Sequence, residues 1–265
     1  MIFFNTLHLV IVLLLTILTQ IGGLVYLLCF SISKKIEFFK VSKFKTTVLF
    51  LVVYATFTLL IVPKIAPVFG REQIKITQSI KPASFIINIL NRNYVVPELN
   101  ILLNKTALQL NNTGVEIKYL DANFPFIDGF PLWPHLSHND GKKIDLSFVY
   151  EDENSAMVNK IKSITGYGVF EAPMKNEINQ TKICKNEGYW FYDFTKYISL
   201  GTKNQHLKFS TKGNLLLLNA LLAQNKISKI FIEPHLKQRL KLRHQKIRFH
   251  GCKAVRHDDH IHLQL

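Results

Sequence analysis

The chain ends with the stretch "RHDDHIHLQL", Arg256–Leu265. Its last six residues predict a β-strand, and side chains two positions apart on a strand project from the same face. His260 and His262 are therefore expected side by side, where both can reach one metal ion, or one can bind it while the other moves a proton. His257 precedes them on the loop entering the strand. A polar or adventitious metal-binding tail is the alternative, but the stretch is not a homopolymer and continues a strand pattern.

A second cluster of the same residue types lies far upstream, in "PHLSHNDGKKID", Pro134–Asp145. His135 and His138 stand in a loop rich in turn residues, and Asp145 stands near the start of a predicted strand. Loops held by strand ends commonly carry metal ligands. Two histidines and one aspartate leave a fourth position for water, which is typical of catalytic zinc. Zinc would lower the pKa of that water toward ~7, and spare histidines can act as general bases.

The rest of the C-terminal part alternates helical and strand patterns without a strict βαβ rhythm. This order predicts a mixed α+β domain over residues 97–265 rather than a doubly wound sheet. Residues 67–96 are expected to form a connector, with a first short helix near its end. Helices are expected at 85–90, 97–110, 213–226 and 235–245, and strands at 115–120, 144–150, 229–233, 246–250 and 260–265.

The N-terminal part contains two apolar runs. Leu7–Phe30 holds no acidic or basic residue except His8, and Thr46–Val62 ends at Pro63. The first run is long enough to cross a ~30 Å hydrocarbon core at 1.5 Å per residue. We therefore predict a membrane hairpin of two transmembrane helices over residues 1–66. A cleaved signal peptide is the rival for the first run, but no basic residue precedes it, and its apolar core exceeds the usual ~7–15 residues.

The loop between the two runs is rich in lysine and holds one acidic residue, Glu37. An excess of basic residues marks a cytoplasmic loop, so both termini are expected to face outward. Residues 97–265 would then lie outside the bacterial inner (cytoplasmic) membrane, in the periplasm or its equivalent. The loop lysines are Lys34, Lys35, Lys40, Lys43 and Lys45.

The formal net charge of the 265 residues is +15. Two interpretations of this charge are open. The lysine-rich faces are simply solvated, or they attract an anionic wall polymer or lipid head groups. Nucleic acid is not expected as a partner, because no zinc-finger spacing, phosphate loop or nucleic-acid motif occurs. Of the three cysteines, Cys29 lies in the first apolar run, whereas Cys184 and Cys252 lie in the outward part, where disulfides persist. A Cys184–Cys252 disulfide is a candidate whose geometry the sequence does not fix.

The two histidine clusters together resemble the metal motifs of the penicillin-insensitive murein endopeptidases. These belong to the zinc peptidases that include D-alanyl-D-alanine carboxypeptidases, lysostaphin-type endopeptidases and the Hedgehog fold. The wider group shares His-x6-Asp followed by His-x-His, which His138, Asp145, His260 and His262 match. The endopeptidases add a histidine three residues before each motif, as His135 and His257 do here. Similarity extends to "ELNILLNKTALQLNNTGVEIKYL" and "SKIFIEPHLKQRL", before the first and second motifs.

The resemblance implies a mixed, mainly antiparallel sheet with flanking helices, and zinc held by His138, Asp145 and His262. It implies His260 as base or proton shuttle, with His257 and His135 beside it. The substrate class would be the peptide cross-link of peptidoglycan. The family's arginine after the second motif is missing, so the alternative is a non-catalytic membrane protein whose domain binds wall peptide or metal. A signalling or transport component with a metal-sensing domain is a third hypothesis.

Overall fold

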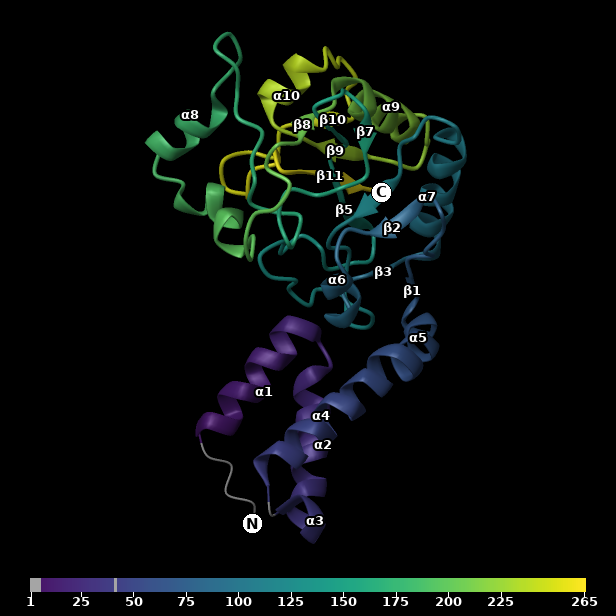
Figure 1. Ribbon diagram of the computed structural model, residues 1–265, viewed down its shortest axis with the longest axis vertical. Helices are drawn as coiled ribbons and strands as arrows, with labels where there is room; N and C mark the ends of the chain where they lie inside the picture. The colour runs from purple at the N-terminus through teal and green to yellow at the C-terminus, as the bar shows by residue number, and fades with distance from the viewer. Residues whose placement is uncertain (1–5, 41) are drawn as a thin grey trace.

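A six-stranded sheet forms the centre of the globular part in the computed structural model, which describes residues 6–40 and 42–265 (Figure 1). Its inner pairs, β9–β11, β11–β5 and β5–β4, are antiparallel, and both outer pairs are parallel. The α+β expectation with a mixed sheet is therefore confirmed. The strand order is β10 (Ile247–Arg248), β9 (Lys229–Phe231), β11 (His260–Gln264), β5 (Lys143–Ser147), β4 (Ile117–Tyr119) and β2 (Ile80–Pro82).

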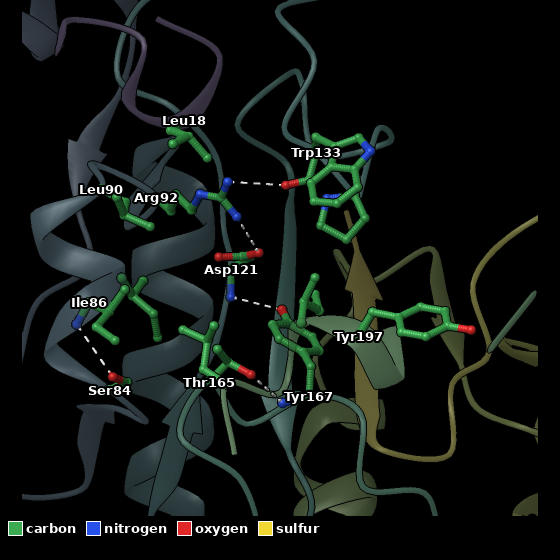
Figure 2. Close-up of a pocket in the computed structure, with 14 residues that line it drawn as sticks. Leu18, Ser84, Ile86, Leu90, Arg92, Asp121, Trp133, Thr165, Tyr167 and Tyr197 are labelled. Carbon is green, nitrogen blue, oxygen red and sulfur yellow. Dashed lines mark hydrogen bonds and ion pairs between the residues drawn. The ribbon is translucent and has the colours of Figure 1, made fainter. Parts of the chain in front are cut away.

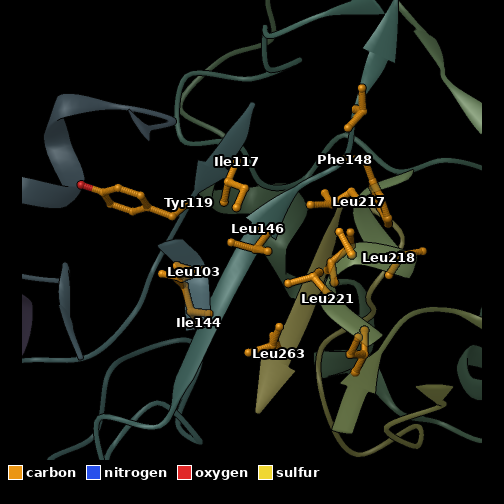
Figure 3. Close-up of a cluster of buried hydrophobic side chains, with 14 of the residues drawn as sticks. Leu103, Ile117, Tyr119, Ile144, Leu146, Phe148, Leu217, Leu218, Leu221 and Leu263 are labelled. Carbon is orange, nitrogen blue, oxygen red and sulfur yellow. The ribbon is translucent and has the colours of Figure 1, made fainter. Parts of the chain in front are cut away.

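The main hydrophobic core lies on one face of this sheet (Figure 3). Ile144 and Leu146 of β5 and Ile261 and Leu263 of β11 are fully buried there. Helices α7 (Pro97–Gln109) and α9 (Thr211–Leu222) cover them with their leucines. Each such side chain stabilises the fold by about 1.5–3 kcal/mol on burial. Because strand side chains alternate, the same two strands direct Asp145 and the two histidines of β11 to the opposite face.

The remaining elements surround this sheet. The expected helices near residues 85 and 235 form as α6 (Phe85–Ile89) and α10 (Pro234–Arg239), both shorter than the sequence pattern. Two smaller sheets hold β1 (Glu72–Gln73) with β3 (Tyr94–Val95), and β7 (Met157–Val158), β6 (Tyr150–Glu151) and β8 (Lys208–Phe209). The long irregular segment contains α8 (Gln180–Asn186) and the 3-10 segment η3 (Trp190–Ile198).

The first apolar run does not form the single spanning helix that we expected. It is broken into α1 (Thr6–Thr19) and α2 (Gly22–Lys35), and Gln20 between them has a φ of 67°. Gly23 allows the two helices to approach closely, because a Cβ there would lie 2.6 Å from the Val12 carbonyl oxygen. The run therefore folds into a short helical hairpin, which apolar composition alone does not reveal.

The second apolar run forms a longer helix than expected. It does not stop at Pro63 but continues from Lys43 to Phe69, 27 residues, and ends at Gly70 with a φ of 72°. The segments are α4 (Lys43–Thr56), the π-helical turn η1 (Phe57–Ile61), α5 (Val62–Ile65) and the 3-10 turn η2 (Ala66–Phe69). A wide π turn just before the proline accommodates its ring and missing N–H.

Within the described residues, Lys43–Phe69 alone is long and apolar enough to cross a membrane, by length and composition. The expectation of two such helices is therefore corrected to one. Residues 1–5, which belong to the predicted hairpin, lie outside the described residues. Residue 41 also lies outside them, in the lysine-rich loop that contains α3 (Glu37–Lys40). In Figure 1, α1 runs toward the globular part, α2 runs back to α3, and α4 returns.

The N-terminal helices from α1 to η2, here called the helical arm, contact the globular part at two places. These are the turn between α1 and α2 and the end of α4. The side-chain oxygen of Gln20 accepts a hydrogen bond from the Phe126 N–H at 3.0 Å. The Tyr54 hydroxyl donates to the Ile89 carbonyl at 2.7 Å. Tyr94 of β3 is buried in the same apolar cluster as residues of α2 and α5. These contacts hold the hairpin against the sheet domain.

Candidate metal centre

The register of β5 and β11 places Asp145 directly opposite His262. Residues opposite one another in an antiparallel pair have Cβ atoms ~4.5–5.5 Å apart on the same face. The loop before β5 supplies His138, whose Nδ1 lies 2.6 Å from the Ala122 carbonyl oxygen. In a neutral His138 ring, this contact places the proton on Nδ1 and leaves the lone pair on Nε2 for another partner.

Three donor atoms meet at this point. His138 Nε2 lies 3.0 Å from His262 Nδ1 and 3.2 Å from Asp145 Oδ1, and His262 Nδ1 lies 2.9 Å from the same oxygen. Donors bound to a tetrahedral ion at ~2.1 Å lie ~3.4 Å apart, so the triangle is close to the size of a metal site. All three residues are buried. They could hold a metal ion.

A second group of donors shares Asp145 with the first. His135 Nδ1 and His260 Nε2 lie 3.4 and 3.6 Å from Asp145 Oδ2, and these three residues could also hold an ion. The Nε2 atoms of His135, His260 and His262 are buried and have no hydrogen-bond partner among the described residues. An unpaired buried polar atom costs about 1–3 kcal/mol, so His260 Nε2, the one of these atoms that lies near Asp145, fits a centre that takes an ion.

Asp145 is held in place by a residue outside both motifs. The Tyr167 hydroxyl donates to Asp145 Oδ2 at 2.8 Å and accepts from the Asp121 N–H at 3.0 Å. Burial opposes the charged form of Asp145, but the neighbouring histidines, His138 and His260 above all, hold the pKa of its carboxyl well below its usual range. The carboxyl group is therefore ionised and ready to bind a cation.

His260 is oriented by its neighbour Asp259, whose Oδ1 contacts His260 Nδ1. Asp259 Oδ2 accepts from the Gly168 N–H and the Thr195 hydroxyl. Burial lowers the pKa of His260, but the carboxylates of Asp145 and Asp259 outweigh it and raise the pKa to about 9. A cation on Asp145 would weaken that attraction.

The other histidines are in less polar surroundings. Burial, reinforced by nearby histidines, lowers the pKa of His262 to about 3 despite the contact with Asp145. His257 packs beside His260, with ring centroids 4.8 Å apart, and burial lowers the pKa of its imidazole well below the usual value. Both rings are therefore neutral at pH 7, and a neutral imidazole is the form that binds metals.

All six residues singled out from the sequence lie in this one cluster. His138, Asp145 and His262 form the tighter group, His135 and His260 lie on the other oxygen of Asp145, and His257 lies against His260. The sequence did not single out Asp121, Asp259 or Tyr167. Asp259 stands beside a ligand motif and could have been suspected, whereas Tyr167 lies in a segment without a motif.

His135 has an anionic partner of its own. Its Nδ1 lies 3.3 Å from Asp121 Oδ2, and the same oxygen accepts from Arg92 Nη1 at 3.1 Å. Burial opposes the ionised form of Asp121, but Arg92 and His135 lower the pKa of the carboxyl. This arrangement links the cluster to Arg92, a residue that is only 7% exposed.

Cys184 and Cys252 are joined by a disulfide in the structure, with Cα atoms 5.2 Å apart. The bond connects α8 to the loop before β11 across 68 residues of sequence. That loop leads into His257 and His260, so the disulfide constrains the segment that carries the second motif.

No family model matches the sequence, and no curated protein matches it. The resemblance of the two motifs to murein endopeptidases therefore stays a prediction that rests on the residues themselves.

Proposed function

We propose that the protein is a zinc metallopeptidase that hydrolyses peptide bonds of peptidoglycan cross-links. The observation that carries the proposal is the buried triangle of His138 Nε2, Asp145 Oδ1 and His262 Nδ1. Two imidazoles and a carboxylate are a donor set that zinc prefers, with one position left for water. When bound, zinc supplies a water of lowered pKa and polarises the carbonyl group that is attacked.

The chain's own residues would divide the work of proton transfer and positioning. His260 Nε2 lies 3.6 Å from Asp145 Oδ2 and has no hydrogen-bond partner among the described residues. A cation on Asp145 would lower the pKa of His260, so that its ring could take a proton from water and return it to the departing amine. Asp259 fixes its ring through Nδ1. The rings of His135 and His257 lie beside that of His260, with centroid distances of 5.3 and 4.8 Å. General acid–base groups typically contribute about 10²–10⁴-fold to a rate.

The proposed location is the bacterial inner membrane, with the domain after Arg71 outside. The apolar helix Lys43–Phe69 and the lysines before it support this orientation. The Cys184–Cys252 disulfide also suits an oxidising compartment. Protease added to intact spheroplasts should digest residues 97–265. Protection of that part, while an external control protein is cut, would reject the orientation.

A non-catalytic domain that binds wall peptide or metal is the second candidate, because a buried set of donors can hold an ion without taking part in a reaction. His260→Ala separates the two. An enzyme should keep its zinc and fold in this variant but lose about 10²–10⁴-fold of its turnover. Zinc content and release of cleaved muropeptides are measured together on the same samples. Unchanged turnover would remove His260 from the mechanism, and zinc-loaded wild type without turnover favours the binder.

A further inference from the structure

A mostly apolar pocket of about 230 Å³ lies between the helical arm and the sheet domain (Figure 2). One wall is Leu18 at the end of α1, and another is Ile86 and Leu90 at α6. Trp133 and Tyr197 lie across from them. Tyr197 is 70% exposed and Leu18 40%, so the mouth of the pocket reaches the surface.

The pocket continues an apolar surface that leads away from the sheet domain. The outward residues of α1 are exposed leucines, valine and isoleucine, and Leu18 is the last of them. In the orientation proposed above, this face of α1 would be in contact with lipid. An apolar chain lying along α1 could therefore enter the pocket without crossing water.

A charged side chain, that of Arg92, lies beside the pocket. Arg92 donates to Asp121 Oδ2 and to the Trp133 carbonyl oxygen, both at 3.1 Å, which uses two of its three guanidinium nitrogens. Its Nε is buried and has no hydrogen-bond partner among the described residues. Because Asp121 neutralises Arg92, the pocket offers no net charge to a free anion.

The far side of the pocket borders the metal centre. Asp121 and Tyr167 line the pocket, and both also contact residues of the centre. Asp121 contacts His135 at 3.3 Å, and the Tyr167 hydroxyl donates to Asp145 at 2.8 Å. A molecule whose apolar end occupies the pocket could thus direct its polar end toward Asp121 and Tyr167, which separate the pocket from the metal centre.

We propose that this pocket binds the hydrocarbon chain of an acyl-bearing peptide carried by the membrane. The inference rests on the proposed peptidase function and membrane location, and it specifies the substrate class: a peptide attached to a lipid chain. The chain would enter along α1, and the peptide would extend past Asp121 to the metal centre.

Photo-crosslinking tests binding without turnover. Full-length protein in phosphatidylethanolamine–phosphatidylglycerol nanodiscs receives a short peptide that is N-acylated with a diazirine-bearing fatty acid. Adducts should map to α6 and to the segments around Trp133 and Tyr197. Leu90→Trp, which fills the pocket, should reduce them about tenfold, because each methylene denied burial weakens binding about fourfold. The matched control Leu108→Trp, on the exposed face of α7, should leave them unchanged.

A second variant, at the surface, keeps the test conclusive if Leu90→Trp does not fold. Tyr197→Asp places a carboxylate at the exposed mouth and should reduce the adducts similarly, because an acyl chain would desolvate it. Adducts confined to α1 and α4, or equal in wild type and both pocket variants, would overturn the inference.

Turnover of matched wall peptides with and without an acyl chain tests the substrate assignment. The acylated peptide should have the higher kcat/KM, and Leu90→Trp should remove that preference. Labelling of the pocket with equal turnover of both peptides would overturn the substrate class. Labelling without hydrolysis of either peptide would instead count against the proposed peptidase function and leave the chain-binding pocket standing.

Discussion

His138 Nε2 and His262 Nδ1 lie 3.0 Å apart although 124 residues separate them in the sequence. Both atoms lie within 3.2 Å of one oxygen of Asp145. In a neutral His138 ring the Nδ1 contact with the Ala122 carbonyl oxygen takes the proton, and Nε2 presents a lone pair to this point. The arrangement brings electron-pair donors together in a buried place, which is favourable when a cation lies between them.

The first prediction concerns the three donors. His138→Ala, Asp145→Ala and His262→Ala should each remove the bound metal, because two remaining ligands hold a catalytic ion poorly. His206→Ala, a histidine outside the cluster, is the matched control and should keep about one ion per chain. Elemental analysis of the purified full-length proteins gives the answer. Full metal occupancy in all three ligand variants would reject the site.

Tyr167 provides a second prediction, on positioning. Tyr167→Phe removes the hydrogen bond to Asp145 Oδ2 but keeps the ring in place. Loss of such an outer contact typically weakens metal affinity about 10–100-fold. Competition with a zinc chelator measures the affinity, and Tyr197→Phe on the surface serves as control. Equal affinities in the two variants would show that Tyr167 does not orient the carboxylate.

A third prediction uses the raised pKa of His260. A folded-state pKa of about 9 against about 6.5 in the unfolded chain means that the folded protein holds the extra proton. The contribution of His260 to the unfolding free energy of the metal-free protein should therefore be complete below pH 6.5. It should be lost as pH rises through 9, by up to about 1.4 kcal/mol per pH unit. Asp259→Asn should flatten this decline.

Urea unfolding in the presence of chelator, at several pH values between 6.5 and 9, measures the effect. Zinc-loaded protein should show a smaller decline, because the cation competes with the proton for Asp145. A metal-free protein whose unfolding free energy is constant over this interval would contradict the proposed interaction of His260 with the two carboxylates.

The disulfide supplies a fourth prediction. A Cys184–Cys252 bond that spans 68 residues should stabilise the fold by about 4 kcal/mol, because it restricts the unfolded chain. The double variant Cys184→Ser/Cys252→Ser should unfold at correspondingly lower urea, whereas Cys29→Ser should change stability much less. Identical unfolding midpoints for the double variant and wild type would show that the bond is absent in the native protein.

The sequence predicts the parts of the site that follow from periodicity. Alternation in β11 predicts that His260 and His262 share a face, and the structure has them so. The sequence does not predict the register that places His262 opposite Asp145, because that register depends on which strands become neighbours. Contacts from unpatterned loops, such as that of Tyr167 with Asp145, depend on tertiary packing and leave no local signal.

The N-terminal helices show the same limit. Composition identifies both apolar runs but not where a helix bends. The first is broken because Gln20 takes a left-handed conformation and Gly23 allows close packing of α1 and α2. The second continues past Pro63 because a π turn precedes the proline. Both outcomes are set by backbone geometry at single residues, which a hydropathy pattern averages out.

The most direct test of the central proposal is incubation of the metal-loaded full-length protein with purified peptidoglycan, with and without chelator. We expect release of cleaved cross-linked muropeptides, its loss when chelator removes the metal, and its return when zinc is added back. The His138→Ala protein should release none under any of these conditions. Release that is unaffected by chelator, or zinc-loaded wild-type protein that cleaves no wall peptide, would contradict a zinc peptidase.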